Sequence, residues 1–231
     1  WEAVCFDHNF DTLKALADKA ADSGVERFVV DDGWFGSRRD DTSGLGDWQI
    51  AQDVWPDGPK SLKALADYVH AKGMEFGLWF EPEMVNPDSD VARNHPDWIL
   101  SPTAGRLPLQ GRTQQVLDLT NPDAFDYIYG CMDQLVGELG IDYIKWDHNK
   151  LVTEPAAPAA RPCTRRPLPS TTSSRASRPH IRALRSKAAP LVAAAWILAS
   201  WSTPIVSGSP TAWTRSSART SSATPRCWCR R

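Results

Sequence analysis

The segment Asp142-Tyr-Ile-Lys-Trp-Asp-His-Asn149 is the most informative part of the chain, because its pattern is typical of a hydrophobic strand that ends in charged side chains. If it is a strand, Lys145 and Asp147 lie two residues apart and leave the same face of the sheet. Two earlier segments also run from apolar residues into carboxylates, Val29-Val-Asp-Asp-Gly-Trp34 and Phe76-Gly-Leu-Trp-Phe-Glu-Pro-Glu83. Parallel strands that end in this way build the site at the carboxyl-terminal rim of a (β/α)8 barrel. The pattern therefore predicts an α/β enzyme with its site at this rim.

The rest of residues 1–154 alternates between strand and helix patterns, as in a parallel α/β fold. Gly24, Gly73 and Gly140 follow the predicted helices, where a left-handed residue closes the last turn, and Asn121-Pro122 is a typical helix start. The longest connection, residues 83–118, is expected to be a loop that folds over the rim. The expected strands span residues 2–6, 27–31, 75–80 and 142–146, and the expected helices span residues 11–22, 60–72 and 122–139.

The composition changes abruptly after Glu154. All 28 acidic residues lie at or before this position, whereas residues 155–231 contain 12 Arg, one Lys and no Asp or Glu. We therefore predict that residues 1–154 encode about the first four βα units of a (β/α)8 TIM barrel and that residues 155–231 form a tail without a native fold. A basic, disordered arm that binds nucleic acid is an alternative for the tail, although such arms rarely carry several Trp residues.

Length, charge and hydropathy limit the possible classes. A chain of 231 residues can form one barrel-sized domain or one to two smaller domains. The net charge of -2 gives no long-range field for nucleic acid, and no apolar run of about 18 residues could span a membrane. The five Cys show neither a zinc-site spacing nor a disulfide pattern, so no metal site is expected. Because the chain opens on Trp1, we expect an internal piece of a longer protein, and no visible leader favours a cytoplasmic location.

Several motifs together resemble the catalytic barrel of the family 36 glycoside hydrolases, the bacterial α-galactosidases. The resemblance covers residues 1 to about 154, roughly the first half of such a barrel. It implies retaining hydrolysis of terminal α-galactosides such as melibiose and raffinose, with galactose-containing oligosaccharides as partners, no cofactor, and homo-oligomers among intact members. The motifs, in order, are Trp1-Glu-Ala, Phe28-Val-Val-Asp-Asp-Gly-Trp-Phe-Gly36, Gly44-Leu-Gly-Asp-Trp48, Phe76-Gly-Leu-Trp79, Glu81-Pro-Glu-Met-Val85, His95-Pro-Asp-Trp98, Val116-Leu-Asp-Leu119 and Lys145-Trp-Asp147.

The resemblance also implies roles for individual residues. A retaining glycosidase uses one carboxylate as nucleophile and a second carboxyl group as acid and then base, about 5 to 5.5 Å away. The Lys-Trp-Asp motif makes Asp147 the nucleophile, and Asp31 and Asp32 bind the O4 and O6 end of galactose, where the axial O4 distinguishes it from glucose. Arg112 lies in a loop in which Thr113 stands where the family has Asn. The complete implied substrate-binding set is Asp31, Asp32, Trp34, Trp79, Arg112, Lys145 and Asn149.

The chemistry of these side chains fits the implied roles. A covalent glycosyl intermediate needs an ionised carboxylate, and Lys145 is expected to lower the pKa of Asp147. Ammonium donors and carboxylate acceptors suit sugar hydroxyl groups, and flat indole faces suit the C–H side of a pyranose. Each residue also has a structural alternative: Asp31 and Asp32 as helix caps, Lys145 and Asp147 as an ion pair, Trp34 and Trp79 as core residues, and Glu81 and Glu83 as supports for their loop.

Residues 155–231 lack the second half of the implied mechanism. In the family, a Ser-Cys-x-Ser-Gly-Gly strand end and a Ser-Asp-x-x-Asp segment with the acid/base follow the nucleophile, and neither occurs here. Loss of a general acid costs about 10² to 10⁴ in rate, so we expect the acid/base to be absent and the chain to be inactive. Two other classes stay open: a truncated, non-enzymatic fragment that at most binds galactosides weakly, and a Schiff-base aldolase that uses Lys145.

We predict that the tail results from a shift of the reading frame. One permitted set of codons for residues 185–199, shifted by one base, reads E-I-E-S-C-A-S-G-G-G-R-V-D-L-G, and the following codons permit an acid/base Asp across Pro210 and Thr211. DNA sequencing is expected to reveal a one-base slip between about Glu154 and Arg165. Codons incompatible with the shifted reading would instead make the tail a genuine extension.

Overall fold

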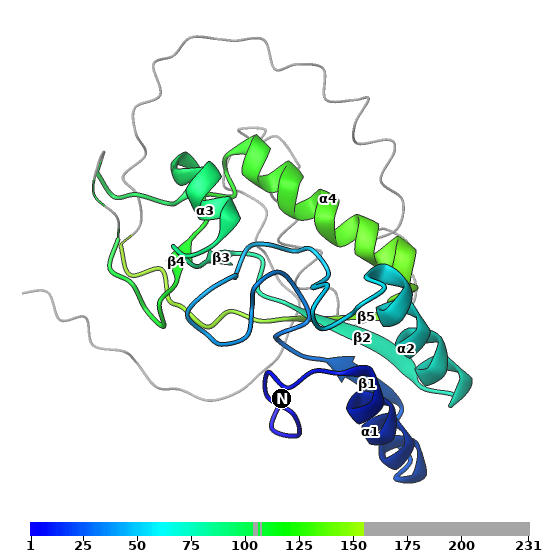
Figure 1. The fold of residues 1–231 in the computed structure, drawn as a ribbon. Coiled ribbons are helices and arrows are strands. Elements are labelled where there is room, and N and C mark those ends of the chain that lie inside the picture. The colour runs from blue at the N-terminus through cyan, green and yellow to red at the C-terminus, as the bar shows by residue number, and fades with distance from the viewer. Residues whose placement is uncertain (104–105, 107, 155–231) are drawn as a thin grey trace, which may run out of the picture.

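Three parallel strands form the central sheet of the computed structural model, which describes residues 1–103, 106 and 108–154 (Figure 1). The order is β1-β2-β5, with β1 at Arg27–Val30, β2 at Glu75–Phe80 and β5 at Tyr143–Trp146. Within the described residues the sheet is open and does not close into a barrel. Residues 155–231, for which we predicted a tail without a native fold, lie outside the described residues.

The three long helices begin and end close to the predicted positions. They are α1 at Phe10–Asp22, α2 at Pro59–Ala71 and α4 at Pro122–Leu139. The side chain of Asn121 accepts a hydrogen bond of 3.1 Å from the backbone N–H of Asp123, and Gly140 ends α4 with a left-handed φ of 68°. Helix α2 packs against α1, α4 and β2, and so holds the helices to the sheet.

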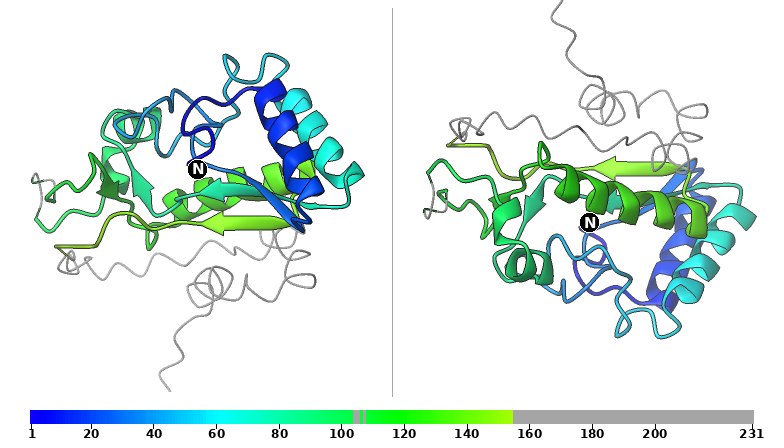
Figure 2. Two further views of the ribbon diagram at one scale, coloured as in Figure 1. Left: turned by 90° about the horizontal axis from the view of Figure 1, so that it is seen from below. Right: turned by 90° about the horizontal axis from the view of Figure 1, so that it is seen from above.

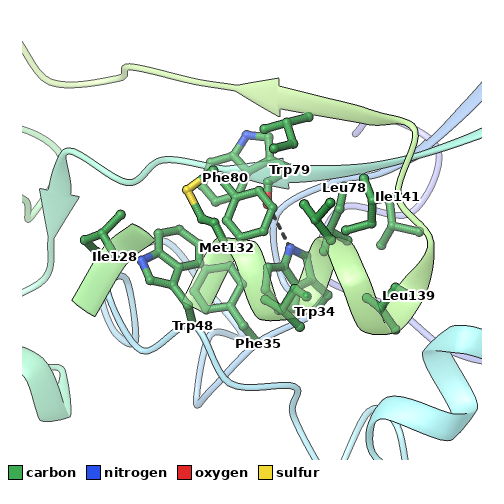
Figure 3. Close-up of a cluster of buried hydrophobic side chains, with 14 of the residues drawn as sticks. Trp34, Phe35, Trp48, Leu78, Trp79, Phe80, Ile128, Met132, Leu139 and Ile141 are labelled. Carbon is green, nitrogen blue, oxygen red and sulfur yellow. Dashed lines mark hydrogen bonds between the residues drawn. The ribbon is translucent and has the colours of Figure 1, made fainter. Parts of the chain in front are cut away.

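The core is an aromatic cluster between β2 and α4 (Figure 3). Strand β2 is buried on both faces from Phe76 to Phe80, as a central strand of a parallel sheet requires. Trp34 follows β1 and is fully buried against the rings of Phe80 and Trp48, with centroid distances of 5.4 and 6.1 Å. Its indole N–H donates a hydrogen bond of 2.9 Å to the carbonyl oxygen of Trp79. This bond fixes the loop after β1 to the end of β2.

The long connections after β1 and β2 gather at the carboxyl edge of the sheet (Figures 1 and 2). The segment 83–118 was expected to be a loop, and it contains short elements that give it a defined shape. Two of them, β3 and β4, pair antiparallel and pin the segment beside the sheet edge. The elements are β3 at Met84–Val85, α3 at Asp90–Asn94, the 3-10 helix η1 at Pro96–Trp98 and β4 at Gln115–Val116.

The strand predicted for residues 2–6 is wrong. This segment forms turns, in which the carbonyl oxygen of Trp1 accepts hydrogen bonds from the backbone N–H groups of Val4 and Cys5, at 3.1 and 2.8 Å. Cys5 has a φ of 47°, in the left-handed region, so the backbone turns where a strand would stay extended. The described residues therefore contain three of the four predicted parallel strands.

Gly77 and Gly130 provide a matched test of this packing. A Cβ at Gly77 in β2 would lie 2.9 Å from Cγ2 of Val29 and 3.2 Å from the carbonyl oxygen of Tyr143, whereas a Cβ at Gly130 in α4 would meet nothing within 4 Å. We expect Gly77→Ala to lower the free energy of unfolding by about 1–3 kcal/mol through overpacking. Gly130→Ala is expected to raise it by about 0.5–1 kcal/mol through helix propensity. Urea unfolding measures both changes, and equal effects of the two substitutions would contradict the strand register.

Candidate active site

The ends of all three parallel strands bring their polar side chains to one edge of the sheet. The ammonium Nζ of Lys145 donates a hydrogen bond of 2.6 Å to Oδ2 of Asp31, and the indole Nε1–H of Trp79 donates one of 3.1 Å to Oδ2 of Asp147. Trp79 and Lys145 are partners in the β2–β5 register. The structure thus assembles Asp31, Trp79, Lys145 and Asp147 at the rim, as predicted from their positions at strand ends.

The carboxylate that pairs with Lys145 is Asp31. The two residues are far apart in sequence, and their ion pair joins β5 to the end of β1. The Asp31 side chain is 11% exposed and that of Lys145 is 41% exposed, so the contact lies at the border of solvent. Oδ1 of Asp31 also accepts a hydrogen bond of 2.9 Å from the backbone N–H of Asp32. Lys145 therefore pairs with Asp31 and affects the pKa of Asp147 less directly than the sequence suggested.

Asp147 is held in its ionised form. Burial would raise the pKa of Asp147, but hydrogen bonds from the Asn149 side chain, from the Trp79 indole and from the backbone of His148, with the charge of Lys145, outweigh burial and lower it. The His148 backbone N–H lies 2.9 Å from Oδ1 of Asp147. The hydrogen bonds act more strongly on this pKa than the neighbouring ammonium does. An ionised, half-buried carboxylate in such a position is chemically suited to nucleophilic attack.

Glu81 supports the segment that follows Asp147. It is fully buried, and its carboxylate accepts hydrogen bonds from the Asn149 backbone N–H and, at 3.1 Å, from Nε2 of Gln114. Burial raises the pKa of Glu81, and the hydrogen bonds from Asn149 oppose that rise. Glu83 accepts a hydrogen bond of 3.1 Å from the indole of Trp146. Both glutamates therefore contact loop and strand residues, in agreement with a supporting role.

Asp32 lies beside Asp31 but belongs to a separate, buried ion pair. The guanidinium of Arg38 donates hydrogen bonds to both carboxylate oxygens of Asp32, at 2.8 to 3.2 Å. Burial raises the pKa of Asp32, and the hydrogen bonds and charge of Arg38 act against that rise. Arg38 is 1% exposed and was not identified from the sequence, because nothing in Ser37-Arg-Arg39 distinguishes it from its partly exposed neighbour Arg39.

Trp34 and Arg112 lie in different surroundings from the rest of the candidate set. Trp34 is wholly enclosed in the core, so the described structure offers no exposed face of its ring to a sugar. Arg112 is exposed on the loop before β4, with a left-handed φ of 53°, and its charge opposes the rise that burial causes in the pKa of Asp32. Its neighbour Thr113 also has a left-handed φ, and its hydroxyl donates a hydrogen bond of 3.0 Å to the carbonyl oxygen of Asp41.

In the part of the chain that the structure describes, no group of three or more His, Cys, Asp or Glu residues could hold a metal ion. No helix among those same residues is both long enough and apolar enough to cross a membrane.

The protein is of the α/β class, with a parallel sheet whose strands end in carboxylates. Comparisons with known proteins identify its family. The chain belongs to the Melibiase family, which matches residues 1–171. It is 51% identical over 150 residues to an α-galactosidase from Escherichia coli, a match that covers 65% of this chain and 21% of the relative. The chain thus spans about a fifth of the length of the curated relatives it matches.

Solved structures share this part of the fold. The GH36 α-galactosidase AgaA from Geobacillus stearothermophilus superposes with a TM-score of 0.64 at 43% identity, over 70% of this chain and 22% of that chain. A variant of AgaA was solved in complex with raffinose and gives a TM-score of 0.64 at 39% identity, over 80% of this chain and 24% of that one. The parallel sheet described above therefore corresponds to the catalytic region of these enzymes.

The indole of Trp79 can be tested as a determinant of the charge on Asp147. We expect Trp79→Phe to raise the pKa of Asp147, because the substitution removes a hydrogen-bond donor to its carboxylate. Trp146→Phe is the matched control, since its indole donates to Glu83 at the same distance of 3.1 Å. Carboxyl carbon NMR titration measures the pKa of Asp147. The same pKa in both variants would contradict the described geometry.

The same depressed pKa predicts how this carboxylate affects stability. Since the pKa of Asp147 is lower in the folded state, its ionised form stabilises the fold above the unfolded pKa. This contribution is lost as pH falls through the folded pKa. In acid unfolding, Asp147→Asn should therefore lose less stability than the unchanged chain as pH falls through this range. An identical pH dependence for the two proteins would show that Asp147 is not stabilised as an anion.

Proposed function

We propose that residues 1–154 are the N-terminal half of a (β/α)8 barrel from a retaining α-galactosidase, and that Asp147 is its nucleophile. The observation that carries this proposal is the position of Asp147, ionised at a strand end and bonded to Trp79. Its substrates are terminal α-galactosides such as melibiose and raffinose. Family relatives solved with raffinose and with stachyose support this substrate class.

In the proposed reaction, a carboxylate oxygen of Asp147 attacks the anomeric carbon of the galactosyl group, and a covalent glycosyl–enzyme forms as the leaving group departs. A second carboxyl group protonates the leaving oxygen and then activates water, which releases galactose with retained configuration. Lys145 and Asp31 present donors and acceptors to the sugar hydroxyl groups from one ion pair. Trp79 holds the nucleophile by its indole N–H, and Asn149 supports it from the following segment.

We propose that this chain lacks the carboxyl group that acts as acid/base. We infer that residues 155–231 are translated out of frame, so that neither the acid/base nor strands five to eight of the barrel are encoded. The change of composition after Glu154 supports this inference, because residues 155–231 contain 12 Arg and no Asp or Glu. The parent enzyme is proposed to be cytoplasmic and homo-oligomeric.

Two alternatives make use of the same residues. A non-enzymatic fragment would keep the rim and bind galactosides weakly, and the intact Asp31–Lys145 pair favours it as the second candidate. An aldolase would require Lys145 as a free amine that attacks a carbonyl. The close contact of the Lys145 ammonium with Asp31 argues against that chemistry.

The 231-residue chain is expected to show no appreciable hydrolysis of an aryl α-galactoside, because the acid/base and the second half of the barrel are absent. Release of nitrophenol from p-nitrophenyl α-galactoside by the purified chain measures this. Turnover at about 1 to 10³ per second, the range of ordinary enzymes, would refute the proposal that the chain is incomplete.

The nucleophile is tested in a complete barrel, built by replacing the matching segment of Geobacillus stearothermophilus AgaA with residues 1–154. In this chimera Asp147→Asn should lower turnover by more than about 10³-fold, since no covalent intermediate can form. Asp142→Asn is the control, because Asp142 lies at the other end of β5 and bonds to His70. Near-normal activity of the Asp147→Asn chimera would place the nucleophile elsewhere.

A further inference from the structure

The buried ion pair between Asp32 and Arg38 lies next to the rim and has no part in the mechanism described so far. Asp32 is 8% exposed and Arg38 is 1% exposed. Nε of Arg38 lies 3.0 and 3.2 Å from the two carboxylate oxygens of Asp32, and Nη2 lies 2.8 Å from Oδ2. This two-pronged contact fixes the plane of the carboxylate as well as its position. A buried charge pair of this kind is costly unless all of its donors find partners.

The remaining donors of Arg38 are tied to two other segments. Nη1 donates to Oδ1 of Asn86 at 3.0 Å and to the carbonyl oxygen of Ser43 at 3.2 Å. Asn86 is itself buried, and it accepts from the Leu45 backbone N–H at 2.9 Å and donates to the carbonyl oxygen of Thr113 at 2.8 Å. The guanidinium of Arg38 therefore connects the end of β1 to the loop before residue 48 and to the segment after β3. Asn86 extends this network to the loop that carries Arg112.

We propose that Arg38 is the positioning residue that aims Asp32 at the sugar and thereby sets the preference of the site for galactose over glucose. The inference rests on the proposed function and deepens it, because it names the group that fixes a sugar-binding carboxylate. Adjacent carboxylates repel one another, and here each has its own cation, Lys145 for Asp31 and Arg38 for Asp32. Each of the two adjacent carboxylates therefore has a cation within hydrogen-bond distance.

The geometry of the Asp32 carboxylate explains why such an arrangement is selective. An ionised carboxylate has about four lone-pair sites and donates nothing. Arg38 directs two N–H groups at these sites, the Nε–H shared between both oxygens and an Nη2–H to Oδ2, so that about two sites are left for hydroxyl groups that donate to them. An acceptor that cannot rotate distinguishes an axial from an equatorial hydroxyl, whereas a freely rotating carboxylate could reach either. The fixed plane imposed by Arg38 is therefore the source of the selectivity.

Arg39 provides the matched control within the same loop. It pairs with Asp53, whose side chain is 70% exposed, and its other donors bond to backbone carbonyl oxygens. A change at Arg39 alters a neighbouring charge without altering the Asp32 contact. Lys keeps the positive charge at either position but cannot form the planar, two-pronged bond of a guanidinium.

The test compares Arg38→Lys and Arg39→Lys with the unchanged 231-residue chain, using galactose and glucose as probes in saturation-transfer NMR. Circular dichroism first checks that each variant keeps the fold. We expect Arg38→Lys to weaken galactose binding about tenfold, as the loss of charged hydrogen bonds predicts, and to bring the affinities for galactose and glucose together. Arg39→Lys is expected to change neither. Equal galactose affinity and selectivity in the two variants would overturn the inference.

A second measurement on the same proteins separates this inference from the proposed function. Titration of the Asp32 carboxyl carbon by NMR reports on the Arg38 contact without any sugar, and we expect the pKa of Asp32 to rise in Arg38→Lys relative to Arg39→Lys. If the unchanged chain binds neither sugar, residues 1–154 do not form a galactose site by themselves, and the Asp32 titration alone tests whether Arg38 positions this carboxylate. An Asp32 pKa that is the same in both variants would show that Arg38 does not position this carboxylate.

Discussion

The ion pair between Lys145 and Asp31 is the interaction on which the rim depends. It joins the ends of the two outer strands, β1 and β5, on either side of β2. Asp31 is followed directly by a second carboxylate, Asp32, and two adjacent anions at a strand end would repel one another without cations nearby. Lys145 and Arg38 each neutralise one of them. The arrangement of charge at the rim therefore follows from which cation each carboxylate receives.

The aromatic core and the rim are parts of one structure. Trp79 packs in the cluster below the rim and also donates its indole N–H to Asp147 at the rim (Figure 3). Its backbone carbonyl oxygen accepts the indole N–H of Trp34, which closes the loop after β1. A side chain whose rotamer is locked by packing holds its partner within narrow limits. The orientation of Asp147 is in this way linked to the burial of residues in the aromatic cluster.

The sequence was sufficient for the elements whose signals are local. Asn121-Pro122 and Gly140 predicted both ends of α4, because caps act within one turn of the helix. The two-residue spacing of Lys145 and Asp147 predicted their shared face. The strand predicted for residues 2–6 was wrong, since its apolar residues resemble a strand while Cys5 adopts a left-handed conformation. Nothing in the local pattern of that segment distinguishes a strand from a turn.

Contacts between distant segments could not be predicted from the sequence. The Lys145 ammonium was expected to act mainly on Asp147, and its close partner is Asp31, which is far away in the chain. Arg38 was indistinguishable from Arg39 in a polar loop, although one is buried and the other is partly exposed. Burial of Trp34 likewise follows from the position of α4 and β2 around it. Such features depend on how the elements pack, and local patterns do not encode that packing directly.

We propose that the ends of β1, β2 and β5 form a galactose-binding rim. The most direct test is a titration of the 15N-labelled chain with galactose, followed through the indole N–H signals of its Trp residues. We expect the Trp79 signal to move, because its acceptor Asp147 is the proposed nucleophile that contacts the sugar, while the signal of Trp146, which donates to Glu83, stays in place. A Trp79 signal that does not move at saturating galactose would show that these strand ends do not bind galactose.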